Sequence, residues 1–182
     1  MNFDLYKQSK ETAQCVREKF VEQFVDTSRR FYQEHICESL LEAIEAYEIG
    51  GHAYSFLYCC LKKGTYYYST PEKAIAYLKT LGEKSVYIMF DLHPLKVGYN
   101  EVFPSDTVLL MTAKEAAEIV EHDVIKITDI RNEYWGEDVY IIDTDFTWHI
   151  DFSHDDFDDG TRYCYTSIKS LEDEEIRIRM GE

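Results

Sequence analysis

The sequence lacks the short motifs that mark the commonest enzyme classes. It has no phosphate-binding glycine loop, no G-x-S-x-G nucleophile elbow, no H-E-x-x-H zinc motif and no glycine-rich dinucleotide turn. Its eight glycines fall mostly where helices stop or turns are expected. These absences lower the odds of an enzyme and favour a binding protein.

The chain also lacks paired cysteines and long hydrophobic runs. Five cysteines, an odd number, form no C-x-x-C motif: Cys15, Cys37, Cys59, Cys60 and Cys164. The longest apolar stretch, Ala53 to Leu61, is far too short to span a bilayer. Charged residues such as Asp4 and Lys7 interrupt the apolar core that a signal peptide would need. We expect a soluble cytoplasmic protein.

Positive charge is scarce. Nineteen basic residues face 35 acidic ones, which gives a formal charge of −16. Nucleic acids and anionic membranes both require cationic surface, so neither is an expected partner. A macromolecular partner would instead be a basic protein, and no cofactor is expected.

Composition and length predict one domain over residues 1–182. Hydrophobic residues make up 45% and aromatic residues 15% of the chain, which is enough apolar surface for a single core without disulfides. We expect an α+β fold with a helical portion over residues 1–50, a sheet portion with two short inserted helices over 51–170, and a polar tail over 171–182 that suits a short terminal helix. Residues 53–61 fit either a strand or a short helix.

Two capping patterns in the sequence predict where helices begin. Thr70 precedes Pro71, which places a capping hydroxyl before a proline at the first helical position. Thr112 stands three residues before Glu115, the spacing of a capping box. Near the N-terminus, the polar segment 26–28 is expected to separate two helices, with one long bent helix as the alternative.

The remaining pattern predicts a mostly antiparallel sheet. In the segment Phe146–Ser153, alternate residues such as Ile150 and Phe152 are expected to face the core, while His149 and Asp151 face solvent. A tight turn is expected at residues 143–145. The expected strands are Tyr66–Tyr68, Ser85–Asp91, Asp106–Met111, Val124–Thr128, Asp138–Ile142, Phe146–Ser153 and Arg162–Ile168.

The segment Glu133–Asp159 carries ten carboxylates and no lysine or arginine. Exposed aromatic rings bordered by carboxylates are the composition of a surface that binds arginine or lysine of a protein partner. The same acids could instead only keep the sheet soluble. The residues expected to bind a partner are Asp143, Asp145, Asp151, Asp155, Asp156, Asp158 and Asp159, with Trp135 or Tyr163 as anchors.

Two alternatives to a binding module stay open. A metal-dependent hydrolase would use His149, His154 and either Asp155 or Asp156, with a more distant ligand such as His93. The acids after residue 154 depart from calcium-loop spacing and also suit an ordinary turn at Asp158-Asp159-Gly160, so no metal site is assigned. An assembly subunit would pack its helical N-terminus against another copy through Phe20, Phe24 and Leu41.

The segment Trp135-Gly136-Glu137-Asp138-Val139-Tyr140-Ile141-Ile142-Asp143, with Phe146-Thr147-Trp148 and Ser153-His154-Asp155, resembles a pattern in small acidic bacterial proteins of unknown function, some of which look like immunity proteins of toxin systems. The resemblance covers about thirty residues. It implies a cytosolic α+β domain that blocks a basic toxin through an acidic face. It transfers no catalytic residue.

Overall fold

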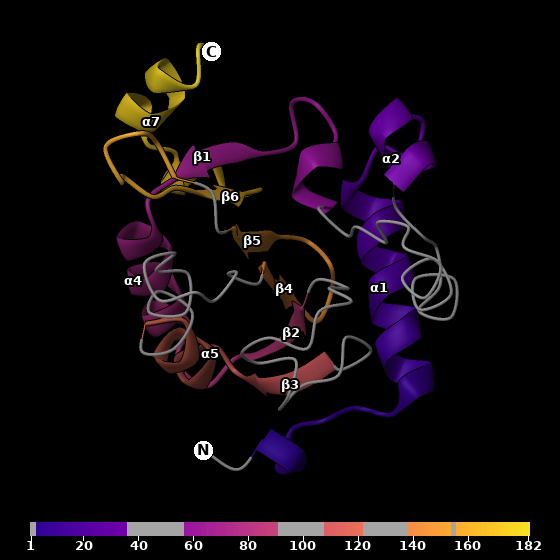
Figure 1. Cartoon of the computed structure of the whole chain (residues 1–182). Coiled ribbons are helices and arrows are strands. Elements are labelled where there is room, and N and C mark those ends of the chain that lie inside the picture. Colours follow the sequence, from indigo (N-terminus) through magenta and orange to yellow (C-terminus); the bar gives the residue numbers. More distant parts are fainter. Residues whose placement is uncertain (1–2, 36–56, 91–107, 122–137, 154–155) are drawn as a thin grey trace.

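The computed structural model describes residues 3–35, 57–90, 108–121, 138–153 and 156–182. Over these residues the chain has the expected α+β architecture, with one antiparallel sheet between helices (Figure 1). The sheet order is β1-β6-β5-β4-β2-β3. The strands are β1 (Tyr67–Ser69), β2 (Ser85–Phe90), β3 (Val108–Thr112), β4 (Val139–Asp143), β5 (His149–Phe152) and β6 (Cys164–Thr166).

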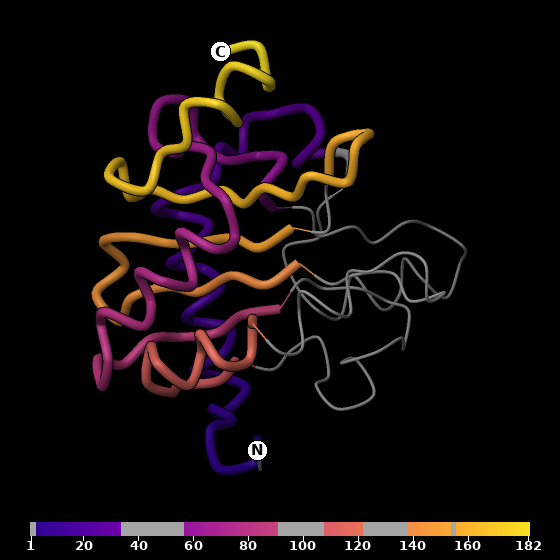
Figure 2. Tube along the Cα trace, turned by 90° about the vertical axis from the view of Figure 1, so that its left-hand side faces the viewer, coloured from indigo at the N-terminus to yellow at the C-terminus, as the bar shows by residue number. Residues whose placement is uncertain are grey.

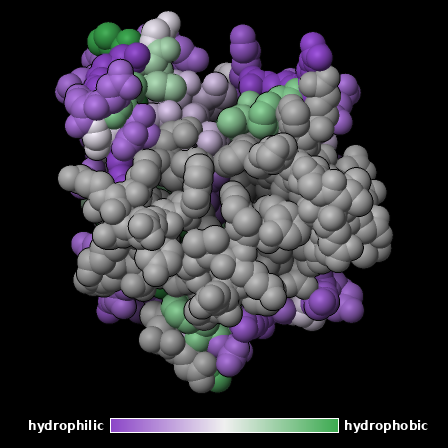
Figure 3. All heavy atoms as spheres, in the orientation of Figure 1, coloured by the Kyte–Doolittle hydropathy of each residue, from purple (hydrophilic) through white to green (hydrophobic). Residues whose placement is uncertain are grey.

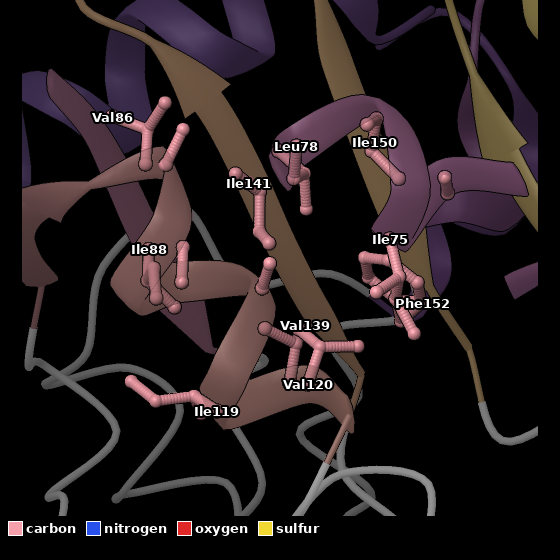
Figure 4. Close-up of a cluster of buried hydrophobic side chains, with 14 of the residues drawn as sticks. Ile75, Leu78, Val86, Ile88, Ile119, Val120, Val139, Ile141, Ile150 and Phe152 are labelled. Carbon is pink, nitrogen blue, oxygen red and sulfur yellow. The ribbon is translucent and has the colours of Figure 1, made fainter. Parts of the chain in front are cut away.

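Helices α4 (Pro71–Leu81) and α5 (Ala113–Ile119) cover one face of the sheet (Figure 1). Ile75 and Leu78 of α4, and Val120 at the end of α5, lie against the aliphatic side chains of the strands (Figure 4). The strands contribute Val86, Ile88, Val139, Ile141, Ile150 and Phe152 to this cluster. Burial of these side chains supplies the hydrophobic driving force on this face.

Helix α1 (Lys10–Phe24) lies on the other side of the sheet, as Figures 1 and 2 show. It buries Val16, Phe20 and Phe24 in a second cluster that includes Tyr140 and Ile142 of β4. The 3-10 helix η2 (Leu57–Cys60) adds Leu57 and Cys60 to the same cluster. The single core expected from composition is therefore divided by the sheet into two layers.

Both edges of the sheet are closed by other parts of the chain. At the β3 edge, the Gln8 N–H donates to the Val108 carbonyl at 2.9 Å and the Leu110 N–H donates to the Tyr6 carbonyl at 2.9 Å. At the β1 edge, the Asp173 N–H donates to the Tyr68 carbonyl at 2.8 Å. Covering an edge removes the unpaired backbone groups on which another strand could add.

The local helix signals are confirmed. The Thr70 side chain accepts a hydrogen bond from the Lys73 N–H, and Pro71 opens α4. Thr112 and Glu115 form the predicted capping box at the start of α5. Helix α1 ends before the expected break, and α2 (Arg30–His35) follows it. The C-terminal helix α7 (Glu174–Arg179), preceded by the 3-10 turn η6 (Lys169–Leu171), is also present.

Several expectations are refined or lie outside the described residues. Residues 57–60 are a 3-10 helix rather than a strand. β5 begins only at His149, so Phe146 packs with the α1-side cluster and not beside Ile150. The predicted strand Val124–Thr128 lies outside the described residues. No helix in the described part of the chain is both long and apolar enough to cross a membrane.

The α5 capping box provides a test of these local contributions. Thr112→Ala removes the acceptor for the Glu115 N–H, a 3.2 Å bond, and leaves that donor at the helix start without its side-chain partner. We expect the free energy of unfolding, measured with urea, to fall by about 1 kcal/mol. Thr144→Ala, the same change at an exposed turn position, should stay within about 0.5 kcal/mol of the wild type. Equal losses in the two variants would contradict a capping role.

Candidate functional site

The polar face of β5 is buried. His149 and Asp151 are each 0% exposed and Ser153 is 6% exposed, so the expectation that this face is wet is wrong. The alternation itself holds, because Ile150 and Phe152 pack on the α4–α5 side. The second face is also covered because α1 lies across it.

His149 and Asp151 form a hydrogen-bonded pair beneath α1. The His149 Nδ1 and Asp151 Oδ1 atoms are 2.8 Å apart. The imidazole lies against Phe20, with ring centroids 5.5 Å apart, and against Phe24, with centroids 4.4 Å apart. The rings of α1 thus cover an acid–imidazole pair that period-two reasoning placed in solvent.

The other polar atoms on this face have no hydrogen-bond partner among the described residues. They are Nε2 of His149, Oδ2 of Asp151 and Oγ of Ser153. Burial removes water from the Asp151 carboxylate and raises its pKa, while His149 opposes the increase and Asp138 adds to it. Burying a charged carboxylate with an unpaired oxygen costs folding free energy, and protonation of the carboxylate reduces that cost.

This geometry bears on the hydrolase alternative. An aspartate that holds one imidazole nitrogen is the orienting half of a general-base pair, but the second nitrogen must reach a substrate or nucleophile. Here that nitrogen, Nε2 of His149, is buried beside the α1 phenylalanines. Of the other predicted ligands, His93, His154 and Asp155 lie outside the described residues, and Asp156 is exposed on the loop after β5. Within the described part of the chain, no three His, Cys, Asp or Glu side chains are grouped to hold a metal.

The predicted acidic residues do not form one face. Asp143 is committed to the β4–β5 hairpin, where its carboxylate accepts hydrogen bonds from the Thr147 N–H at 2.6 Å and the Trp148 N–H at 2.9 Å. Asp145 is exposed at the same turn. Asp151 is buried within β5 and cannot contact a partner. The expectation that it lies on an acidic surface is therefore wrong.

The other three described carboxylates lie past the opposite end of β5. Asp156, Asp158 and Asp159 are exposed, and we call residues 156–162 the acidic turn. It is closed by hydrogen bonds from the Phe157 N–H to the Thr161 carbonyl at 2.9 Å and from the Gly160 N–H to the Phe157 carbonyl at 2.7 Å. Gly160 has a φ of 78°, a conformation that favours glycine.

Asp159 is the most strongly held of these carboxylates. It accepts a hydrogen bond from the Thr161 N–H at 3.0 Å and pairs with Arg179 of α7 at 3.0 Å. Bonds from Thr161, and then the Arg179 guanidinium, lower the pKa of Asp159 to about 2. Asp159 is therefore ionised throughout the physiological range.

Of the two aromatic residues predicted to anchor a partner, the structure describes Tyr163. Tyr163 is only 8% exposed and packs between Phe157, at 5.1 Å between ring centroids, and Tyr165, at 5.8 Å. It supports the acidic turn from within and offers little surface for contact. Trp135 lies outside the described residues. Sequence reasoning missed the half-buried Phe157 and the exposed Arg179 that contacts it, because the two residues are 22 positions apart and carry no shared local signal.

The buried pair makes a prediction about pH. Because folding raises the pKa of Asp151 from its ordinary value of 3.8, the folded chain holds this proton more tightly than the unfolded chain. The stability from this group is complete below pH 3.8 and is lost as the pH rises through the raised pKa. Asp151→Asn, which has no titrating proton at this position, should therefore become progressively more stable relative to the wild type as the pH rises above 3.8.

The measurement is urea unfolding of both proteins at several pH values. Asp145→Asn removes a carboxylate from an exposed turn position and should stay within about 0.5 kcal/mol of the wild type throughout. A difference between Asp151→Asn and the wild type that is constant with pH would show that Asp151 does not take up a proton on folding.

Comparison of the chain with known protein families, with curated proteins and with solved structures finds no match. The resemblance to immunity proteins therefore stays a prediction. The function therefore has to be inferred from the residues of this chain, and the acidic turn combines three exposed carboxylates with backbone hydrogen bonds that close the loop.

Proposed function

We propose that this chain is a non-enzymatic binding module for a basic protein. The observation that carries the proposal is the acidic turn, where Asp156, Asp158 and Asp159 are exposed on a hydrogen-bonded loop beside the ring of Phe157. A loop held in one conformation loses little entropy when a partner binds. Exposed carboxylates beside an aromatic ring suit the cationic side chains of such a partner.

The charge of the whole chain supports the same function. A formal charge of −16 creates a field that attracts basic proteins and repels nucleic acids. Complementary charge mainly increases the association rate, and the effect weakens as salt screens the field. The acidic turn would then provide the local contacts once the partner has arrived.

The finer form of the proposal is an immunity-type inhibitor of a basic toxin. Its support is the resemblance of the segment Trp135–Asp155 together with the hydrogen-bonded acidic turn that follows it. An inhibitor needs a preformed surface and no chemistry of its own, and this suits a chain whose acid–imidazole pair is buried.

The other two functions gain no support from the described residues. The hydrolase would require His149, which is buried beneath Phe20 and Phe24. The assembly subunit would require Phe20 and Phe24 on the surface, but both pack against the chain's own sheet. Leu41, its third predicted contact, lies outside the described residues.

Charge reversal at the acidic turn tests the proposal. Tagged protein is used to capture partners from its native lysate at low salt, and the association rate of the captured protein is then measured with purified components. We expect Asp156→Lys with Asp158→Lys to lower this rate at least about tenfold at low salt, because the local field changes sign. The difference should shrink at high salt.

A matched control separates local charge from total charge. Glu83→Lys with Glu118→Lys makes the same change in net charge at two exposed positions away from the acidic turn, and we expect a much smaller effect. Equal losses in both double variants would remove the acidic turn from the proposal. Recovery of only acidic or neutral partners would remove the proposal itself.

A further inference from the structure

An arginine of the chain itself occupies the acidic turn. The guanidinium carbon of Arg179, the last residue of α7, lies 3.8 Å from the centroid of the Phe157 ring. Its Nη2 donates to Oδ2 of Asp159 at 3.0 Å. An aromatic face combined with a carboxylate is a common way for proteins to hold a guanidinium group, because the ring stacks on its plane while the oxygen accepts its hydrogens.

The receptor side of this contact is built independently of Arg179. Phe157 and Asp159 stand on the same closed turn, and the Thr161 N–H fixes the carboxylate through Oδ1 at 3.0 Å. Tyr163 packs against the Phe157 ring. The ring and the carboxylate therefore keep their relative positions when the arginine leaves.

The arginine side is held only at its tip. Helix α7 is anchored by other groups: Ile176 is 3% exposed, and Asp173 bonds to the Tyr68 carbonyl and to Lys73. The Arg179 side chain is 29% exposed and that of Asp159 is 59% exposed, so solvent weakens their attraction. Rotation of the Arg179 side chain can vacate the site without moving the helix.

The surroundings of α7 are mainly hydrophilic (Figure 3). In Figure 2 the helix lies at the C-terminal end of the chain, at the opposite end of the molecule from α5. A basic protein attracted by Asp156 and Asp158 would thus arrive beside a site already shaped for a guanidinium group.

We propose that Phe157 and Asp159 form an arginine-binding site, which Arg179 fills in the free chain and which an arginine of the basic partner takes over on binding. This inference rests on the proposed function and adds the chemistry of the partner. It also assigns α7 a regulatory contact, because Arg179 competes with the incoming arginine. A lysine would be a poorer ligand, since its ammonium group cannot stack as a plane on the ring.

The test uses two short probes, N-acetyl-Gly-Arg-Gly-amide and its lysine counterpart, titrated into the full chain. Binding is followed by NMR at the Thr161 amide, which bonds to Asp159. We expect Arg179→Ala to tighten binding of the arginine peptide by about fivefold, because the internal competitor is gone. Binding of the lysine peptide should change much less.

Arg177→Ala is the matched control. It removes the same charge from the same helix, but Arg177 pairs with Glu172 and Glu174 and not with the acidic turn. The arginine peptide should bind this variant as it binds the wild type, within about twofold. If both variants gain equally, or if the two peptides gain equally in Arg179→Ala, net charge explains the result and the inference is overturned.

A second variant covers the case in which Arg179→Ala disturbs the turn. Phe157→Leu, with Arg179 retained, removes the ring on which a guanidinium stacks and should remove the preference for arginine over lysine, and a preference that survives would overturn the inference. The two proposals fail separately. Loss of the peptide effects, with the Asp156 and Asp158 reversal still slowing partner association, would reject the arginine site alone. Peptide effects as expected, with no slowing of partner association by the Asp156 and Asp158 reversal, would reject the basic partner.

Discussion

Coverage of the sheet on both faces is the constraint on which the rest of the structure depends. Helices α4 and α5 require apolar side chains on one face of β4 and β5, and α1 requires buried side chains on the other. Every residue of β5 is therefore buried, including His149 and Asp151. Polar side chains at such positions must pair with each other, and they do so through the 2.8 Å contact between Nδ1 and Oδ1.

The same constraint sorts the acidic residues by role. Asp151 is enclosed by the layers, and Asp143 is used to build the hairpin that joins two strands. Among the described acidic residues of this segment, Asp145 and those of the acidic turn lie beyond the strand ends and are exposed. Among the described residues, the acidic segment therefore presents exposed carboxylates at opposite ends of β5, one at the β4–β5 hairpin and three at the acidic turn.

Sequence reasoning succeeded where the signal is local. The caps at Thr70 and Thr112 depend on residues three positions apart, and both are present. It failed for the second face of β5, because alternation shows that two faces differ but not whether another element covers the polar one. The phenylalanines of α1 that cover His149 are more than 120 positions away. The pairing of Phe157 with Arg179 was missed for the same reason, since no local pattern links a turn to the end of a later helix.

The closed edges of the sheet have a consequence for how the chain acquires its fold. Because β1 pairs with β6, residues 67–69 cannot join the sheet before residues 164–166 are in place. Asp173 then covers the β1 edge. At the β3 edge the order is reversed. The covering segment, around Tyr6 and Gln8, precedes β3 by about a hundred residues, so it has no strand to pair with until β3 is present. Contacts between such distant segments carry a large loop-closure cost and form slowly. During synthesis, the sheet cannot be completed until nearly all of these residues have left the ribosome, and until then its β1 side stays open to other strands.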